Sequence, residues 1–149
     1  MPAAQLSPMA KSFDELDAWR LANELKRGVY TLTETGSVTR DFDFRNDLRE
    51  SAKSAPSNIA EGFARYAPRQ FRHFLDIAIG SLAETVNHLR DGVDRKHFTQ
   101  RDITPLLPLA ARARGAAIAL KTSLKDAKPP EPRRRPQRNK PPSPPNPRT

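Results

Sequence analysis

The chain has 149 residues, of which 36% are hydrophobic and none is cysteine, and it carries a formal net charge of +9. This composition suits one compact domain in a reducing compartment, and it excludes disulfides, thiolate catalysis and cysteine-based zinc sites. The charge is uneven, because residues 128–149 hold seven Lys or Arg, one acid and nine of the fifteen prolines. That segment therefore carries +6 of the +9 and leaves +3 for the rest.

We expect three parts: a flexible N-terminus over residues 1–11, a folded domain over 12–127, and a disordered, basic, Pro-rich tail over 128–149. The tail has too few apolar side chains to offset the entropy lost on folding. The sequence has no apolar run typical of a signal peptide, and none approaches the ~20 residues that span a bilayer. We therefore expect a cytoplasmic protein without membrane contact.

The first predicted helix is "FDELDAWRLANELKRGVYTLTE", which begins directly after Ser12; Ser12 and Glu15 have the spacing of a capping box. Apolar residues then recur with a helical period until Gly36 and Ser37 end the pattern. The second predicted helix runs from about residue 41 to 66, and its apolar register continues unchanged through Pro56. This continuity favours one kinked helix, although an interior proline costs about 3 kcal/mol.

Two polar residues of the second helix allow two interpretations. Asn58 and Glu61 are three residues apart, the spacing of an N-cap and its partner in a helix that restarts after the proline. Alternatively, they make polar contacts across helices or between subunits, together with Glu84 of the third helix.

Pro68 is well placed as the first residue of the third predicted helix. Thr99 and Asp102 form a cap-like pair before the fourth, whose first turns Pro105 and Pro108 should disturb. No stretch alternates with a period of two, so we predict an all-α fold, an antiparallel up-down four-helix bundle.

The third helix carries more apolar surface than the bundle needs. Outside its core line lie Phe74, Ile77, Gly80 and Ser81, which favour a second packing partner and therefore self-association. The alternative is that the two large side chains are simply exposed, as single apolar residues often are.

Three segments, "FDELDAWRLANEL", "LRESAKSAPSNIAEGFAR" and "FRHFLDIAIGSLAETVNHL", resemble the four-helix-bundle proteins encoded in intervening sequences of bacterial large-subunit ribosomal RNA genes. The resemblance covers roughly residues 13 to 124, and it extends to the accessory variability protein (Avd) of diversity-generating retroelements. It implies a protomer that assembles into a homopentameric barrel. For the retroelement branch, it also implies a basic surface that binds nucleic acid and a partner reverse transcriptase. The signature positions are Pro56, Asn58, Glu61, Gly62, Ser81 and Glu84.

Catalytic motifs are not recognisable in the sequence. Glu84 and His88 have the spacing of a metal-ligand pair, but a local pair on the helix surface is the favoured interpretation. We expect no enzyme activity, no cofactor and no metal.

The positive features are electrostatic. Candidate nucleic-acid-binding residues lie on the second helix, around the next turn and in the tail: Arg45, Arg49, Lys53, Arg65, Arg69, Arg72, Arg133, Arg134 and Arg135. Arginine binds phosphates in two-point fashion, although a solvated face balanced by acids explains any single group of them. The leading hypothesis is an oligomeric scaffold for RNA or DNA that assists a reverse transcriptase or other nucleic-acid-processing partner. The alternative is a protein–protein adaptor whose tail offers "PPSPPNP" to a Pro-binding domain.

Overall fold

Apolar residues at helical spacing produce four long helices in the computed structural model, which describes residues 10–65 and 67–125. These are α1 (Asp17–Leu32), α2 (Phe42–Ala64), α3 (Pro68–Asp94) and α5 (Leu107–Lys125). Three short elements join them: the 3-10 helices η1 (Phe13–Glu15) and η2 (Ser37–Arg40), and the single turn α4 (Gln100–Ile103). The described residues contain no strand, which confirms the predicted all-α class with four long helices.

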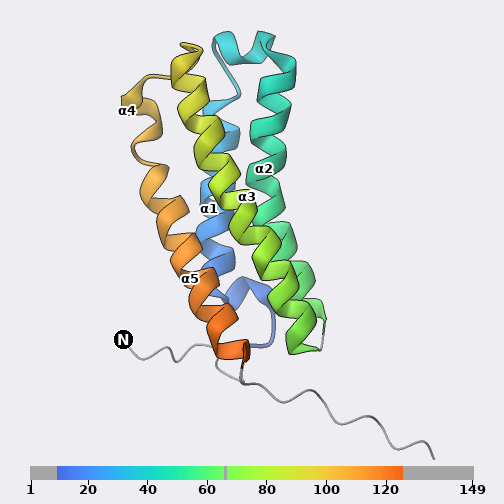
Figure 1. Ribbon diagram of the computed structural model, residues 1–149. Helices are drawn as coiled ribbons and strands as arrows, with labels where there is room; N and C mark the ends of the chain where they lie inside the picture. Colours follow the sequence, from blue (N-terminus) through green and yellow to red (C-terminus); the bar gives the residue numbers. More distant parts are fainter. Residues whose placement is uncertain (1–9, 66, 126–149) are drawn as a thin grey trace, which may run out of the picture.

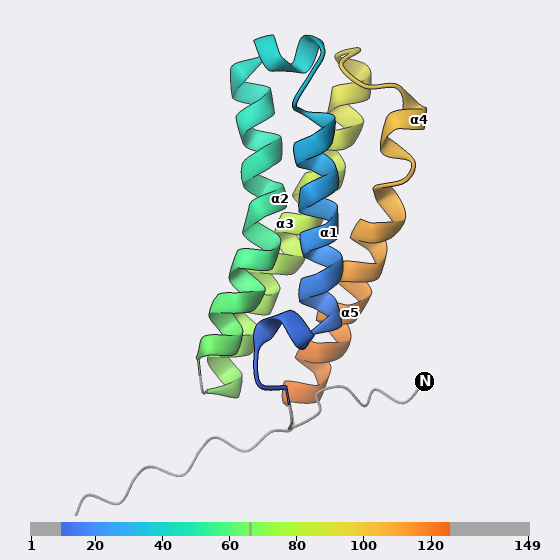
Figure 2. The same cartoon turned by 180° about the vertical axis from the view of Figure 1, so that it is seen from behind.

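The long helices lie side by side, each against two neighbours (Figure 1). Helix α2 packs on α1 and α3, and α5 packs on the same two helices from the other side. The α1–α2 and α3–α4 connections lie at one end of the bundle, and the α2–α3 connection lies at the other (Figures 1 and 2). We call these the loop end and the basic end, because the second also carries Arg69 and the end of α5.

The core is a continuous column of aliphatic side chains. Its largest fully buried members include Leu25, Leu48, Ile59, Leu75, Leu82 and Leu89, at least one from each of α1, α2 and α3. Helix α5 contributes mainly small residues, among them Ala110, Ala113 and Ala117. Each large aliphatic side chain gains about 1.5–3 kcal/mol from leaving water, and the alanines allow α5 to approach closely.

The predicted capping box at the first helix is wrong. The Ser12 side chain makes no cap hydrogen bond and instead bonds to Asp14, while Glu15 Oε2 accepts from the Lys11 backbone nitrogen at 2.8 Å. Helix α1 begins only at Asp17, after a 3-10 turn and an extended Leu16. The turn lets the chain bury Leu16, so the gain from apolar burial outweighs the local capping preference.

Helix α2 runs unbroken through Pro56, as the register predicted. The interpretation of Asn58 as the cap of a restarted helix is therefore wrong. Its side-chain amide donates backward to the Ser54 carbonyl at 2.8 Å, within the same helix. Pro56 is buried, so its ring adds apolar surface to the core where its backbone loses a hydrogen bond.

The remaining helix boundaries follow the sequence signals. Helix α3 begins with Pro68 at its first turn. A complete capping box joins Thr99 and Asp102 at α4, with the two hydrogen bonds at 3.2 and 2.8 Å. The chain then leaves the helix around Pro105 and re-enters it at Leu107, so the predicted disturbance separates α4 from α5.

Candidate nucleic-acid interface

Arg45, Arg49 and Lys53 form a basic ridge along α2, and the two arginines mainly bind the end of α1. Arg45 Nε donates to the Thr33 carbonyl at 2.9 Å, and Arg49 Nε donates to Thr33 Oγ1 at 2.8 Å. Arg49 also reaches the Tyr30 carbonyl at 3.2 Å and lies 4.6 Å from the Tyr30 ring centroid. The last carbonyls of a helix lack partners within it and carry partial negative charge. Both guanidinium groups therefore already stabilise the fold.

A polar groove accompanies this ridge, lined by Tyr30, Arg45, Asn46, Arg49, Glu50 and Lys53. Lys53 Nζ lies 3.7 Å from the Glu50 carboxylate, an exposed pair worth little in stability. The groove contains both charges, since Glu50 lies among the cations, and Arg45 and Arg49 already donate hydrogen bonds to α1. It is a secondary candidate for binding a polyanion.

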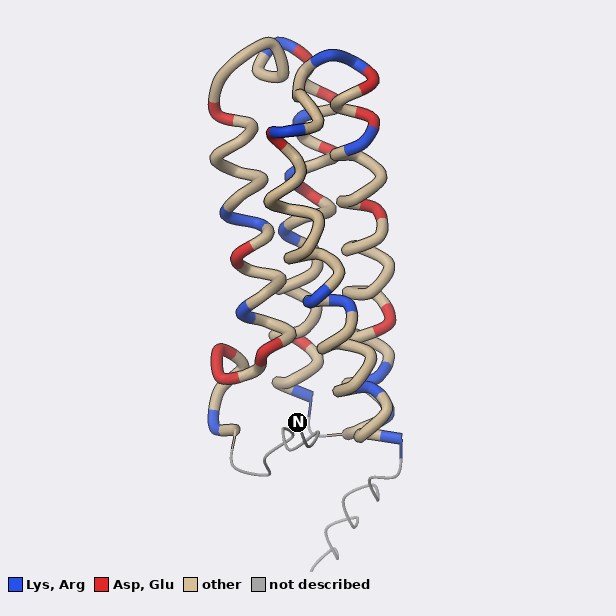
Figure 3. The backbone as a smooth tube through the Cα atoms, turned by 90° about the vertical axis from the view of Figure 1, so that its left-hand side faces the viewer, with Lys and Arg blue, Asp and Glu red and all other residues tan. Residues whose placement is uncertain are grey.

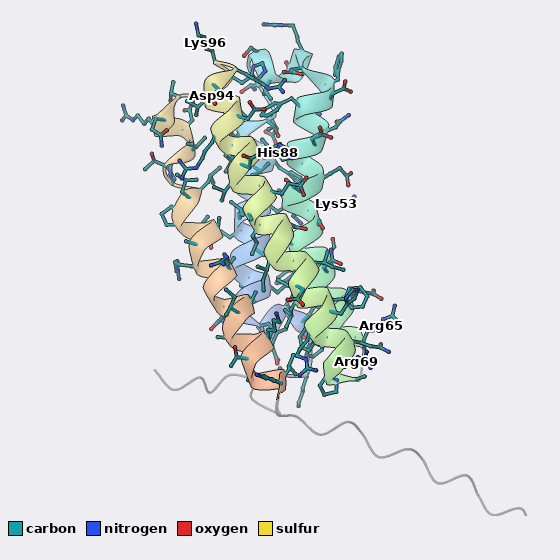
Figure 4. The ribbon with its side chains drawn as sticks, viewed as in Figure 1. Lys53, Arg65, Arg69, His88, Asp94 and Lys96 are labelled. Atoms are coloured by element: carbon teal, nitrogen blue, oxygen red, sulfur yellow. The ribbon has the colours of Figure 1, made fainter. Side chains whose placement is uncertain are left out.

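At the basic end of the bundle, cationic side chains are more exposed to solvent than Arg45 and Arg49 are. Arg65 pairs with Glu61 at 2.7 Å and lies 5.4 Å from the Phe74 ring centroid, yet about half of its side chain stays exposed. Arg69 is exposed, and among residues 10–65 and 67–125 it forms no ion pair. Both side chains project outward from the end of the α2–α3 pair (Figure 4).

The end of α5 lies at this same end of the molecule. Arg72 Nη1 donates to the Leu124 carbonyl at 3.4 Å, which joins the start of α3 to the last turn of α5. Lys125 is exposed beside it and precedes the segment with seven Lys or Arg. Arg133, Arg134 and Arg135 lie outside the described residues.

The proposed polar residues of α2 and α3 form contacts within one protomer. Ser54 Oγ bonds to Ser81 Oγ at 2.7 Å and to the Asn58 amide at 3.0 Å, so Ser54 connects Asn58 to α3. Glu61 pairs with Arg65 of its own helix, and Glu84 approaches His88 of its own helix at 3.5 Å. Their predicted roles between subunits stay predictions.

The close packing of α2 against α3 explains why residue 62 is a glycine. A Cβ at this position would lie 2.6 Å from Phe71 Cδ2 and 2.9 Å from Phe74 Cβ. Only glycine therefore allows α2 and α3 to approach so closely here. Ser81 is likewise buried in the protomer, whereas Gly80 is open and Ile77 is 38% exposed.

The open apolar surface extends beyond the predicted third helix to α5. Between α3 and α5 lies a groove formed by Leu82, Ala83, Val86, Leu107, Ala110 and Ala111. Arg90 and Arg114 flank it. We call it the α3–α5 groove. The sequence signal was available, because α5 is apolar on most sides, with exposed Ala111 and with Ile118 at 37% exposure.

Helix α5 is also cationic. Its charged residues are Arg112, Arg114, Lys121 and Lys125, without an acid (Figure 3). Lys121 pairs with Asp76 of α3 at 2.6 Å. The stretch Gln100–Lys125 is long and apolar enough, by length and composition, to be a candidate membrane-spanning helix. Because the chain bends out of the helix within this stretch and α5 packs in the bundle, this is weak grounds for a span.

A hydrogen-bonded row of side chains closes the loop end. Ser37 Oγ lies 2.8 Å from His97 Nδ1, and His97 Nε2 lies 2.8 Å from Asp41 Oδ2, which also accepts from Arg95 at 3.1 Å. The bond from His97, then Arg95, lowers the pKa of the Asp41 carboxyl. The row joins the α1–α2 connection to the α3–α4 connection. These residues are far apart in sequence, so the pattern gave no signal for them.

These features define an all-α four-helix-bundle protein with a basic end and an open apolar groove. The chain belongs to the family described as 23S rRNA-intervening sequence protein, which matches residues 14–116. This confirms the resemblance to the proteins encoded in intervening sequences of ribosomal RNA genes. No curated protein matches the chain.

Proposed function

We propose that this protein is a non-enzymatic homopentamer that binds nucleic acid, RNA or DNA, through the basic end of each protomer. The observation that carries the proposal is the exposed Arg69, which makes no ion pair in the described part of the chain and lies at the same end as Lys125. The basic segment of residues 128–149 continues from there. The family description, which refers to 23S rRNA, loosely fits an RNA-related role.

Assembly would multiply this charge. Five chains of +9 would carry a total of +45. A field of this sign concentrates polyanions, and each phosphate contact makes affinity depend on salt because counterions are released. Because these arginines and lysines suit phosphate oxygens, we propose binding to the phosphate backbone without sequence preference.

The open apolar surface of α5 and the α3–α5 groove support the oligomer. A helix that is apolar on most sides usually packs against more than its neighbours in one protomer. The stoichiometry of five and a reverse-transcriptase partner come from the sequence resemblance, and both remain proposals.

Filter binding of single-stranded RNA and DNA at two salt concentrations tests the function. The double variant R69E/K125E should lower affinity about tenfold or more, since it reverses two charges at each basic end. The matched control is R40E/R101E, which makes the same change at two exposed residues of the loop end. Affinity that is flat across salt, or an equal loss in both variants, would reject the proposed site.

Deleting residues 128–149 separates this function from the adaptor alternative. If the protein binds nucleic acid, the deletion should weaken RNA binding and lower its salt dependence, because cations are removed. If the tail is a ligand for a Pro-binding domain, the deletion should leave RNA binding unchanged.

A further inference from the structure

The α3–α5 groove has an apolar floor and a cationic rim. Leu82 and Ala110 lie at its base, and Arg90 and Arg114 flank it. Neither arginine forms an ion pair with another described residue. An occupant that buries this surface must supply apolar area, and it gains most if it also brings carboxylates to the two guanidinium groups.

The chain carries such a segment at the start of α2. Phe42 is 70% exposed, the most exposed of the large apolar side chains in the structure's described residues. Asp43 follows it directly in the chain, and Asp47 lies one helical turn after Asp43. Both are exposed, and neither forms an ion pair with a described residue. Aromatic side chains are enriched in the core of protein interfaces, and polar or charged residues form the rim.

We propose that the α3–α5 groove of one protomer receives Phe42 of a second copy of this chain, with Asp43 and Asp47 of that copy facing Arg90 and Arg114. This inference rests on the homo-oligomer of the proposed function and names the surfaces that meet in it. It assigns the partner as the chain itself, because both complementary surfaces are present on one protomer.

The two surfaces lie on different sides of the protomer. Helices α2 and α5 lie on opposite sides of the bundle (Figures 1 and 2). Phe42 lies at the loop end, whereas the groove lies nearer the middle of the bundle, because α3 pairs there with Ser51 and Ser54 of α2. The contact therefore joins two different surfaces in a head-to-tail manner. Repetition of a head-to-tail contact produces a closed ring when the rotation between copies closes.

Two variants test each side of the contact separately. F42E removes the aromatic anchor, and A111E places a carboxylate in the groove beside Arg114. Each alone should reduce the oligomer to a single protomer of 16.7 kDa by light scattering, with helical circular dichroism unchanged. F13E, at the 38% exposed Phe13, is the matched control and should leave the oligomer intact.

Mixing F42E with A111E is the decisive step. F42E retains an intact groove and A111E retains an intact Phe42, so an equimolar mixture should form a heterodimer of twice 16.7 kDa. Likewise, D47R and R114E should each weaken association at least tenfold, and the double variant should regain most of the loss.

The outcomes separate this inference from the proposed function. An oligomeric wild type whose size is unchanged by F42E and A111E, or variants that do not complement on mixing, overturn the assigned contact alone. A wild type that is monomeric at micromolar concentration overturns both the contact and the ring. Salt-dependent RNA binding by that monomer would still support nucleic-acid recognition.

Discussion

The contact of α3 with α2 differs from its contact with α5. Between α2 and α3, small residues and hydroxyls fill the space, and Gly62 brings the backbones together. Between α3 and α5, an apolar groove stays open under two arginines. The same helix thus has one completed interface and one that leaves apolar surface in water.

This difference separates residues that stabilise the protomer from residues available to a partner. Signature positions such as Gly62 and Ser81 lie in the completed interface, where their chemistry is satisfied internally. The side chains that line the α3–α5 groove leave apolar surface exposed in the protomer. Substitutions in the two regions test this contrast.

The largest effect is expected from Gly62→Ala in the completed interface. The added Cβ would lie 2.6 Å from Phe71 Cδ2, so the ring or the helix must shift. We expect a loss of about 1–3 kcal/mol in the free energy of unfolding. Urea denaturation measures it. An unchanged or increased stability would show that α2 and α3 are less tightly packed than described.

The next effect comes from the buried hydroxyls between α2 and α3. Thr85 Oγ1 lies 3.0 Å from Ser51 Oγ and 2.8 Å from the Ser81 carbonyl. Thr85→Val keeps the shape but removes the hydroxyl, and we expect a loss of about 1 kcal/mol. The control is Thr122→Val on α5, whose exposed hydroxyl donates to the Ile118 carbonyl of its own helix. Equal effects in the two variants would contradict the contrast.

Replacing a glycine on the open surface by alanine should raise the stability of the protomer instead of lowering it. Beyond the glycine's own stretch of helix, a Cβ at Gly80 or Gly115 would meet no atom of residues 10–65 and 67–125 within 4 Å. Alanine is favoured over glycine inside a helix, so each variant should gain about 0.5–1 kcal/mol in protomer stability. Thermal unfolding of G80A and G115A beside G62A gives the comparison directly. Destabilisation of both would mean that the open side is not open in solution.

The smallest effect concerns pH at the loop end. Because His97 and then Arg95 lower the pKa of the Asp41 carboxyl in the folded protein, this group stabilises the fold above its ordinary pKa. That contribution is lost as the pH falls below about 4, through the lowered folded pKa. The melting temperature of D41N should therefore lie below that of the wild type at pH 6 and approach it toward pH 2. A difference independent of pH would exclude this role.

The sequence predicted the helices better than their contacts. Periodicity and proline positions located α2, α3 and the break before α5, because those signals act within one segment. The Ser12 capping box failed because burial of Leu16 decides the local conformation. The roles of Arg45 and Arg49 were missed as well, since the end of α1 that they bind is brought near only by packing.

In the candidate site, too, some features could be predicted from the sequence and others depend on how the helices pack. Arg65 and Arg69 follow directly from the sequence as exposed charges next to a turn. The α3–α5 groove depends on how two helices pack, and no periodicity shows how completely they fill the space between them. The row from Ser37 through His97 to Asp41 joins residues up to 60 positions apart.

Light scattering on an equimolar mixture of F42E and A111E tests the central claim most directly, namely that the open side of α3 and α5 is completed by another copy of the chain. We predict two separate monomers of 16.7 kDa that combine into a heterodimer on mixing. Two proteins that keep the size of the wild type, or two monomers that stay apart when mixed, would contradict it.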